Sequence, residues 1–411
     1  MPKLSIDDIN VQGLRVLVRL DLNVPLDDHG RITDDRRIQA ALPTVQKLLH
    51  DGGRLILISH LGRPKGDPEK DKRLTLEPIA ERLAHLLGQP VMFVPDCVGP
   101  EVQEKVKTLR DGQCCVLENL RFHEGETIKD AKAKGDPDLR SCKDQFAEKL
   151  AALADVYVND AFGTCHRDNA SMLTVPQKMH HQPRVMGYLV AKELKFLGGA
   201  VADPKRPFVV ILGGAKVSDK VGTIEALLEK CDTILIGGAM AFTFAAAQGT
   251  AVGRSLTEPD RYDTARRLQA KAGDRIRLPI DSVAAAEIRS DAPTRVCESS
   301  IPQDMMGLDV GPKTISAYRD ILQTAGTIVW NGPMGVFETP PFDTGTLAIA
   351  NAVANATDRG AVTIVGGGDS AAAISAAGLS DRITHVSTGG GASLEFLEGK
   401  PFAAIEILDE A

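Results

Sequence analysis

The stretch Ala361–Ala373, AVTIVGGGDSAAA, decides the fold class of this chain. A short β-branched run stops at three glycines, and Asp369 and Ser370 then precede an alanine run that favours helix. We expect a strand, a loop of bare backbone and a helix start at which Asp369 and Ser370 are good capping residues. Such a loop suits a phosphate group, because glycine exposes backbone N–H groups and a helix N-terminus carries partial positive charge. Asp369 would repel that phosphate unless a cation lay between them, which points to Mg²⁺. For this stretch alone, a glycine-rich turn that merely packs helix on strand is an equal alternative.

Length and composition bound the class of protein. The chain has 411 residues, of which 43% are hydrophobic and 25% charged, and its net charge is −7. This length predicts two domains. The negative charge argues against general nucleic-acid binding, so any anion site must be a local basic cluster. No apolar stretch approaches the roughly 18 residues of a membrane span, and Met1-Pro2-Lys3 opens no signal peptide. We therefore expect a cytoplasmic protein that binds neither nucleic acid nor membrane.

The cysteines and histidines do not predict a metal site. The seven cysteines are scattered, contain no CxxC pair and have no histidine nearby at metal-ligand spacing. They are expected to be reduced thiols that fill the core. Several histidines, among them His123, His180 and His181, are expected at the surface or on helices.

Short apolar runs alternate with helix-like segments along the whole chain. Continuous runs of this kind fit strands buried on both faces, as in parallel sheets covered by helices. Two sets of such units predict two doubly wound, mainly parallel-sheet α/β domains, joined by a helix and hinge. The eleven runs are Val16–Arg19, Leu55–Ile58, Val91–Val94, Cys115–Leu117 and Val156–Val158, and then Phe208–Leu212, Thr233–Ile236, Ile276–Leu278, Thr327–Trp330, Val362–Val365 and Ile383–Val386.

The segment Gly187–Val201 is predicted to join the domains as a helix. Its apolar residues Val190, Leu194, Leu197 and Val201 fall on one helical face. We place an N-terminal domain at 1–186, the interdomain helix at 187–202 and a C-terminal domain at 203–392. The charged stretch Glu124–Gln145 is expected to be a solvated excursion without chemistry.

The residues after each strand decide function, because ligands of open α/β sheets bind beyond the carboxyl ends of the strands. In the first half these residues are mostly basic. Guanidinium groups match carboxylate and phosphate geometry, and neighbouring acceptors and donors would suit a hydroxyl group. We predict a pocket for a small phosphorylated hydroxy-acid, although a surface ion pair is the commoner fate of any single arginine. The basic residues are Arg37, Arg63, Arg121 and Arg167 with His60 and His166, and Asp21 and Asn23 add acceptors and donors.

The second half offers backbone N–H groups and lysine instead. Lys216 follows two glycines at a strand end, and Lys220 lies one helical turn further on, so both could face phosphates. An exposed helix lysine is nearly as good an interpretation of Lys220. No GxxxxGK[ST] loop occurs, and neither glycine-rich loop matches GxGxxG. An anion pocket in one domain and a phosphate site in the other favour a phosphotransferase that closes across a hinge.

Eight motifs, in order along the chain, are similar to those of the phosphoglycerate kinase family. They are VRLDLNVP (18–25), SHLGRP (59–64), ENLRFH (118–123), NDAFGTCHR (159–167), ILGGAKVSDK (211–220), VWNGPMGVFE (329–338), VGGGDSA (365–371) and VSTGGGASLEFLEG (386–399). The resemblance implies two Rossmann-like domains, a monomer, and reversible transfer between 1,3-bisphosphoglycerate with ADP and 3-phosphoglycerate with MgATP. It also implies that residues 393–411 return to the N-terminal domain.

The resemblance assigns roles to positions of this sequence. Arg37 and Lys216 would act in the transfer, with Arg36 exchanged for Arg37 if the alignment shifts by one. Glu338 would hold the ribose hydroxyls and Asp369 the Mg²⁺, and Gly389, Gly390 and Gly391 would face the transferred group. The substrate residues are Asp21, Asn23, Arg37, His60, Arg63, Arg121, His166 and Arg167; the nucleotide residues are Lys216, Lys220, Gly238, Gly307, Asn331, Glu338, Gly366, Gly367, Gly368, Asp369 and Ser370. Ala239 departs from the family, in which a third glycine is common.

Two other classes of function compete with this interpretation. An NAD-dependent dehydrogenase would share the fold, but it should carry GxGxxG after a strand with an acidic residue downstream, and that pattern is absent. A non-catalytic binding protein could keep two sheets, yet it would have little need for Lys216, Asp369 and the arginines together.

Overall fold

The computed structural model describes residues 2–411, apart from the side chains of residues 68 and 200, so the first residue of the predicted 1–186 domain lies outside it. The chain forms two compact units. The first comprises residues 1–193 and 401–411, and the second residues 194–400. The domain boundaries at 186, 202 and 392 stay a prediction. None of the helices described is long and apolar enough to span a bilayer.

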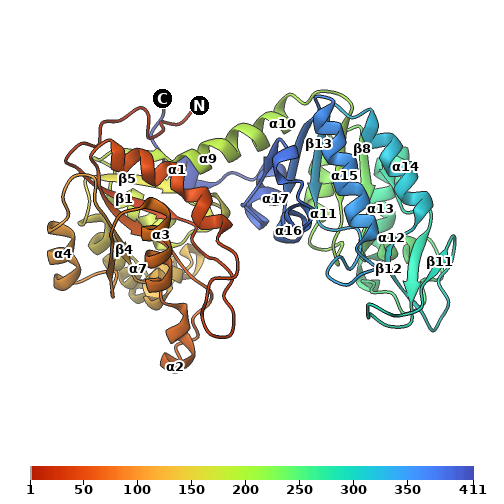
Figure 1. Cartoon of the computed structure of the whole chain (residues 1–411), viewed down its shortest axis with the longest axis horizontal. Coiled ribbons are helices and arrows are strands. Elements are labelled where there is room, and N and C mark those ends of the chain that lie inside the picture. Colours follow the sequence, from red (N-terminus) through yellow and green to blue (C-terminus); the bar gives the residue numbers. More distant parts are fainter. Residues whose placement is uncertain (1) are drawn as a thin grey trace. The chain divides into compact units, whose positions relative to one another are not determined.

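The first unit is a six-stranded parallel sheet with helices on both faces (Figure 1). Its strands lie in the order β3 (Val91–Val94), β4 (Cys114–Leu117), β2 (Arg54–Ile58), β1 (Arg15–Leu20), β5 (Val156–Asp160) and β6 (Arg184–Met186). Its helices are α1 (Arg36–His50), α2 (Pro68–Asp71), α3 (Glu77–Leu87), α4 (Pro100–Lys107), α5 (Glu124–Thr127), α6 (Asp130–Ala133), α7 (Pro137–Ala151), α8 (Val175–Lys178), α9 (Tyr188–Glu193) and α18 (Ala403–Glu406).

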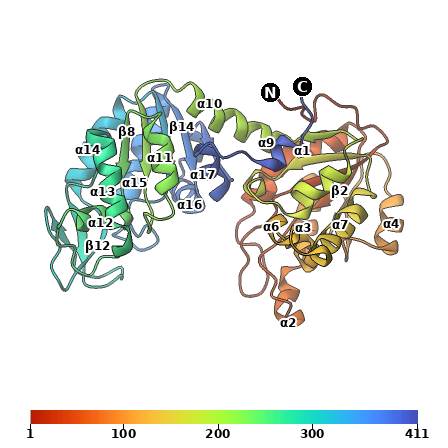
Figure 2. The same cartoon turned by 180° about the vertical axis from the view of Figure 1, so that it is seen from behind.

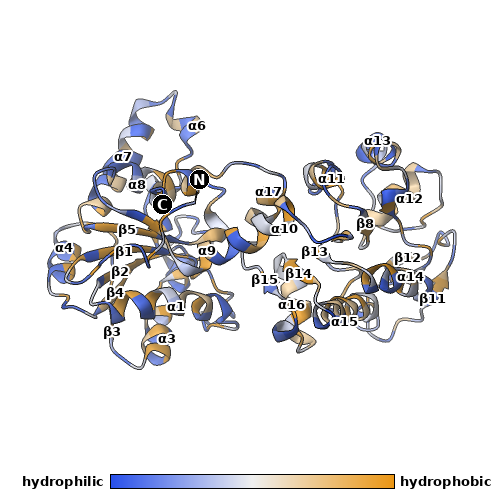
Figure 3. Ribbon diagram, turned by 90° about the horizontal axis from the view of Figure 1, so that it is seen from above, coloured by the Kyte–Doolittle hydropathy of each residue, from blue (hydrophilic) through white to orange (hydrophobic). Residues whose placement is uncertain are grey.

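Each face of this sheet has its own core, because side chains alternate along a strand. Val16 and Val18 of β1 pack on the side of α1 and α3, whereas Leu17 packs on the side of α4 and α7. Figure 3 shows the central strands as strongly hydrophobic between helices of mixed polarity. The predicted continuous apolar runs are therefore explained by burial on both faces.

The N- and C-terminal segments of the chain lie side by side on the first unit (Figures 1 and 2). Lys3 Nζ donates to the backbone oxygens of Glu406 and Leu408, each over 2.8 Å. Arg184 of β6 pairs with Asp409, with 2.6 Å between Nη2 and Oδ1. The last eleven residues are thus fixed to the edge strand of the first sheet.

The second unit repeats the parallel design and adds a small antiparallel sheet. Its main sheet has the order β15 (His385–Val386), β14 (Val362–Gly366), β13 (Thr327–Asn331), β7 (Phe208–Leu212), β8 (Thr233–Ile236) and β9 (Ile276–Arg277). The antiparallel sheet consists of β11 (Arg295–Cys297), β10 (Ser282–Ala285) and β12 (Met306–Val310). All eleven predicted strands are confirmed. The sequence analysis missed β6 and the antiparallel sheet, whose strands are short and whose β11 is exposed at Arg295 and Val296.

Helices cover both faces of the second main sheet (Figure 3). One face carries α11 (Val221–Leu228), α12 (Met240–Ala247) and α13 (Tyr262–Ala272). The other carries α14 (Pro312–Gln323), α15 (Thr344–Asp358) and α16 (Gly368–Ala376), which share a core with Trp330 and Val365. The unit also contains α10 (Gly199–Ala202) and α17 (Gly391–Leu397). The fold class, two parallel-sheet α/β regions, is confirmed.

The segment that joins the units is helical, as predicted. Helix α9 passes into a π-helical turn at Leu194–Gly198 and then into α10. Val190 and Leu197 on its apolar face are buried. The division between the units falls where α9 meets the π-helical turn.

The expectation that Glu124–Gln145 is a solvated excursion is wrong for the part of this stretch that is buried. This stretch forms α5, α6 and the start of α7, and Asp136 caps α7 by accepting hydrogen bonds from the N–H groups of residues 138 and 139. Glu126 and Lys143 are fully buried. Lys143 Nζ pairs with Asp130 over 2.7 Å, so a charged stretch is folded into the unit through internal ion pairs.

Candidate active site

His60 is the centre of a basic cluster in the first unit. It follows β2 and is 4% exposed. Burial, together with the positive charges of Arg19, Arg121, Arg167 and Arg37, holds the pKa of His60 well below its usual 6.5. The structure therefore gathers three predicted arginines around an imidazole that is neutral at pH 7.

Arg37 and Asp21 form the next part of this cluster. Arg37 Nη1 donates to Asp21 Oδ2 over 2.7 Å, and Asp21 is buried directly after β1. Arg37 lies in the first turn of α1 rather than at a strand end as expected. Arg36 instead pairs with Asp34, with 2.7 Å between Nε and Oδ2. Of the two arginines, Arg37 is the one held beside His60.

Arg121 and Asn23 meet at the loop after β2. Asn23 Oδ1 accepts a hydrogen bond of 2.8 Å from the Gly62 N–H, and Arg121 donates to the Gly62 carbonyl. Burial, and then the neighbouring charge of Arg167, lower the pKa of Arg121 to about 10. Arg63 contributes to the same effect. Guanidinium groups that repel one another in this way gain stability from a bound anion.

Arg167 and His166 complete the predicted set in this unit. Both lie after β5, just beyond the 3₁₀ turn Phe162–Thr164, and Arg167 is exposed. Arg167 Nε donates to His166 Nε2 over 3.2 Å. The carboxyl ends of β1, β2, β4 and β5 lie at one edge of the parallel sheet, which is why residues from four loops meet.

The sequence analysis missed a buried layer beneath this cluster. Arg19 is 1% exposed, and its Nε donates to Ser171 Oγ over 2.9 Å. Ser171 Oγ in turn donates to Glu126 Oε1 over 2.7 Å. The signal for Arg19 was present, since a charged residue inside an apolar strand must find partners within the fold. Nothing in the sequence pointed to Glu126 or Ser171.

A cavity of about 310 Å³ marks the candidate site of the second unit. Glycine-rich loops and apolar side chains line most of it, including the predicted residues Gly238 and Gly307. The carboxylates of Glu338 and Asp369 line it as well. Ala239, in the place of a third glycine, is part of the wall. A largely apolar cavity with a few polar groups is typical of small-molecule sites.

Lys220 and Asn331 lie together in the second unit. Lys220 is 8% exposed at the start of α11, so it is not an exposed helix lysine. Its Nζ donates to Asn331 Oδ1, and burial lowers the pKa of Lys220 to about 8. Asn331 Nδ2 is buried and has no hydrogen-bond partner among the described residues. A buried N–H donor of this kind suits a ligand acceptor.

The loop that follows β14 has the expected strand, loop and helix order. The helix α16, however, begins at Gly368, ahead of both expected capping residues, and its N-cap is Gly367 with φ +95°. The expectation that Asp369 and Ser370 cap the helix is therefore wrong. Ser370 is buried, and its Oγ accepts a hydrogen bond of 2.6 Å from the Gly332 N–H. Gly366 is the last residue of β14.

The remaining predicted residues lie outside the lining of this cavity. Lys216 is exposed in the loop after β7. Gly390, with φ +54°, is the N-cap of α17, which begins at Gly391. The Gly389 N–H donates to Ser387 Oγ over 3.1 Å.

Comparison with known proteins identifies the family. The family model described as "Phosphoglycerate kinase" matches residues 6–400. A protein named phosphoglycerate kinase from Rhodopirellula baltica is 52% identical over 414 residues and covers all of both chains. The chain belongs to the phosphoglycerate kinase family. A phosphoglycerate kinase from Chlorobaculum tepidum, 53% identical, likewise covers both chains completely.

Solved structures of phosphoglycerate kinases agree with this assignment. The structure of phosphoglycerate kinase from Coxiella burnetii has a TM-score of 0.83 at 39% identity and covers 99% of this chain and 98% of its own. That of phosphoglycerate kinase from Pyrococcus horikoshii has a TM-score of 0.84 at 32% identity and covers 98% of each. The resemblance drawn from the eight motifs is confirmed.

Proposed function

We propose that the chain catalyses the reversible transfer of a phosphoryl group between 1,3-bisphosphoglycerate with ADP and 3-phosphoglycerate with ATP. The observation that carries this proposal, beyond family membership, is the pair of unlike sites. The first unit gathers guanidinium groups around His60, whereas the second has a cavity lined by glycine loops, Glu338 and Asp369. Side-chain charge suits a small phosphorylated acid, and bare backbone suits a nucleotide. We therefore assign substrate binding to the basic cluster around His60 and nucleotide binding to the cavity of the second unit.

In this proposal the acid is bound by Arg37, Arg121 and Arg167, with Arg63, His166, Asp21 and Asn23 beside them. His60 is neutral and serves as a hydrogen-bonding group. The lowered pKa of Arg121 supports the assignment, since an anion would relieve the mutual repulsion of the guanidinium groups.

The nucleotide is proposed to occupy the 310 Å³ cavity. Glu338 would accept hydrogen bonds from the ribose hydroxyls at one part of the wall. Lys220, Asn331 and the loop Gly366–Gly368 would bind the phosphates, and the unpartnered Asn331 Nδ2 provides a donor for them. Ser370 would support this loop through its bond to Gly332.

The carboxylate of Asp369 at this cavity also fits Mg²⁺. This ion binds through one or two carboxylates and completes its shell with water and substrate phosphates. Asp369 is an exposed carboxylate in the first turn of α16 and lines the cavity, so it is the residue proposed to hold the ion. Bound there, Mg²⁺ would neutralise charge on the nucleotide phosphates.

The transfer is proposed to be direct and in line. A carboxylate oxygen of 3-phosphoglycerate forms a bond to the γ-phosphorus of ATP while the bond from that phosphorus to the ADP oxygen breaks. Lys216 and Arg37 neutralise charge on the migrating group, and Gly389–Gly391 offer backbone N–H donors. The two bound ligands must come within about 3–3.5 Å of each other. We therefore propose domain closure, with the π-helical turn at Leu194–Gly198 as a hinge.

A coupled assay of ATP consumption with 3-phosphoglycerate and Mg²⁺ tests the reaction. Turnover is expected in the wild type, and Lys216→Met should lower kcat at least about 10²-fold, because a transition-state charge contact is lost. A rise in KM alone would make Lys216 a ground-state anchor. A phosphorylated protein trapped after incubation with ATP alone would contradict direct transfer.

Calorimetry tests the metal assignment separately. Asp369→Ala should weaken binding of MgADP strongly while leaving the affinity for 3-phosphoglycerate unchanged. Equal loss of both affinities would reject Asp369 as the Mg²⁺ residue. A monomeric state, a cytoplasmic location and a place in glycolysis complete the proposal and follow from the family.

A further inference from the structure

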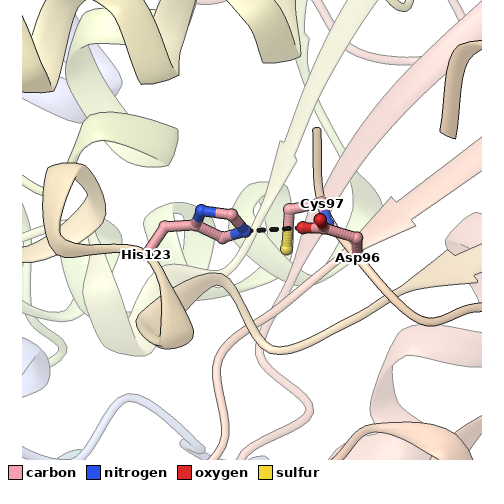
Figure 4. A group of neighbouring side chains, drawn as sticks. All are labelled: Asp96, Cys97 and His123. Carbon is pink, nitrogen blue, oxygen red and sulfur yellow. Dashed lines mark hydrogen bonds and ion pairs between the residues drawn. The ribbon is translucent and has the colours of Figure 1, made fainter. Parts of the chain in front are cut away.

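The strongest side-chain cluster outside the two candidate sites lies at the β3–β4 edge of the first unit. Asp96, Cys97 and His123 each offer a metal-ligand atom, and these atoms all lie within 4.8 Å of one another (Figure 4). The sequence analysis predicted no metal site there, because His123 is far from the cysteine in sequence. The fold brings them together.

Two loops from neighbouring strands build this cluster. Val94, the last residue of β3, pairs with Leu117, the last residue of β4. Asp96 and Cys97 follow β3 directly, and His123 follows the 3₁₀ turn Leu120–Phe122 after β4. Since the paired strand ends are parallel, both loops leave the sheet at the same edge.

The three side chains already contact one another or lie close. His123 Nε2 is 2.8 Å from Asp96 Oδ1, and the same carboxylate oxygen accepts the Cys97 backbone N–H over 2.6 Å. Cys97 is buried and its Sγ is 2.9 Å from the Glu118 carbonyl oxygen. The His123 ring stacks on Phe146 with 4.9 Å between centroids, which fixes its plane. Figure 4 shows the Cys97 sulfur next to the bond between the other two side chains.

We propose that Asp96, Cys97 and His123 form a binding site for a thiophilic divalent cation of the Zn²⁺ class. Sulfur, imidazole nitrogen and carboxylate oxygen are the three donors that Zn²⁺ accepts in proteins, at about 2.0–2.3 Å. Tetrahedral coordination at those lengths separates the donors by about 3.5 Å, so the ion replaces the hydrogen bond between His123 and Asp96. A thiolate and a carboxylate balance its two charges, and water completes the fourth position.

An ion can reach the cluster from the His123 side. A cavity of about 400 Å³ adjoins it, and its lining includes His123, Phe146 and Cys142. The side chains of His123 and Asp96 are 30% and 54% exposed. On binding, the Cys97 S–H bond breaks, a sulfur–metal bond forms and the proton passes to solvent. This site does not depend on the proposed phosphoryl transfer.

Co²⁺ is the probe for the test, because a thiolate bound to Co²⁺ gives a charge-transfer band in the near ultraviolet. Oxygen ligands such as Asp369, or the imidazoles of His180 and His181, give no such band. The reduced, metal-free full chain should bind one Co²⁺ with this band, and Zn²⁺ should abolish the band by displacement. Calorimetry of Zn²⁺ binding in two buffers of different ionisation enthalpy should show release of one proton.

Variants assign the band to the cluster. Cys97→Ser should abolish the band, while Asp96→Asn and His123→Phe should weaken binding of the ion at least about 10-fold. Mutating even a residue that only hydrogen-bonds to a metal ligand lowers metal affinity about 10- to 100-fold. Cys142→Ser is the matched control, because this half-buried cysteine lines the adjoining cavity but lies outside the cluster. It should leave the band unchanged.

The same experiments can overturn the proposal. A band that survives Cys97→Ser and disappears in Cys142→Ser would place the thiolate elsewhere. If Cys97→Ser fails to fold, Asp96→Asn and His123→Phe decide the question, because both residues are partly exposed. Wild-type affinity in both variants, or no band in the wild-type chain, would mean that the residues form only an ion pair beside a core thiol.

Discussion

The guanidinium group of Arg19 donates a hydrogen bond to Nδ1 of His60 over 3.1 Å. Because a guanidinium group cannot accept a hydrogen bond, Nδ1 must carry the lone pair. Neutral His60 therefore has its proton on Nε2. Arg19 is held in turn by Ser171, so a buried chain of hydrogen bonds sets the tautomer of a residue in the candidate substrate site.

His60 is expected to stay neutral throughout the physiological range. Burial first, and then the charge of Arg19, depress its pKa below 6.5. Arg19→Met should raise the pKa of His60 while leaving it below 6.5, because burial remains. Imidazole shifts in an NMR titration between pH 5 and 8 measure both values, and a wild-type pKa at or above 6.5 would contradict the expectation.

The same shift has a consequence for stability. Since the unfolded chain binds a proton at His60 more readily than the folded chain, protonation favours unfolding. The contribution of neutral His60 to the free energy of unfolding is present above pH 6.5, which is the pKa of this residue in the unfolded chain. It is lost as the pH falls below that value. The difference in unfolding free energy between the wild type and His60→Asn should therefore shrink as the pH decreases from 7 to 5, as measured by urea denaturation.

Arg36 and Arg37 give a matched pair for testing the substrate site. Arg37 pairs with the buried Asp21, whereas Arg36 pairs with Asp34 outside the cluster. Arg37→Ala should lower kcat/KM for 3-phosphoglycerate by about 10²-fold, since it removes charge next to the acid and the transferred group. Arg36→Ala should change it by less than about 2-fold, because exposed ion pairs contribute little. The reverse order would mean that the alignment shifted by one residue is the right one.

Lys220 should make nucleotide binding depend on pH. Burial lowers the pKa of Lys220 to about 8, so its ammonium group loses its proton between pH 7 and 9 rather than near 10.5. If this group contacts phosphate, the affinity for ADP should fall over that range in the wild type and should be flat in Lys220→Ala. Calorimetry at pH 7 and pH 9 measures the difference. Lys205→Ala is the control, because Lys205 is exposed just before β7, and it should behave like the wild type. If the affinity of the wild type for ADP depends on pH no more than that of Lys220→Ala, the contact between Lys220 and phosphate is rejected.

Substitutions at Gly238 and Ala239 test whether glycine is required at the first position and optional at the second. A Cβ atom on Gly238 would lie 2.4 Å from the Gly214 nitrogen, and its φ of +65° disfavours other residues. Gly238→Ala should reduce the unfolding free energy by about 2 kcal/mol or more. Ala239→Gly, at the N-cap of α12, should change it by less than about 1 kcal/mol.

Trp330 provides the measurement for this pair. It is the only tryptophan of the chain and lies buried in β13, so its fluorescence during urea unfolding reports on the second unit. Equal midpoints for the two variants would show that the backbone around Gly238 relaxes without cost.

The sequence by itself determined the two parallel sheets, the joining helix and the family. Continuous apolar runs such as Phe208–Leu212 fit strands buried on both faces, and the glycine loops that follow them suit a ligand that approaches the backbone. These are local signals, readable from neighbouring residues. The short antiparallel strands β10–β12 (SVAA, RVC and MGLDV) lack such a signal, because polar residues and glycine interrupt the apolar pattern.

Tertiary structure alone decided which polar residues are buried and which of them meet. Glu126 belongs to a stretch that looks solvated, yet it is buried beneath Arg19 because helix α5 packs against α7 and the π-helical turn that carries Ser171. His123 and Cys97 are likewise brought together only because β3 and β4 are neighbours in the sheet. Strand order is set by the packing of segments far apart in the chain. Spacing along the sequence therefore cannot reveal contacts between loops that share a sheet edge.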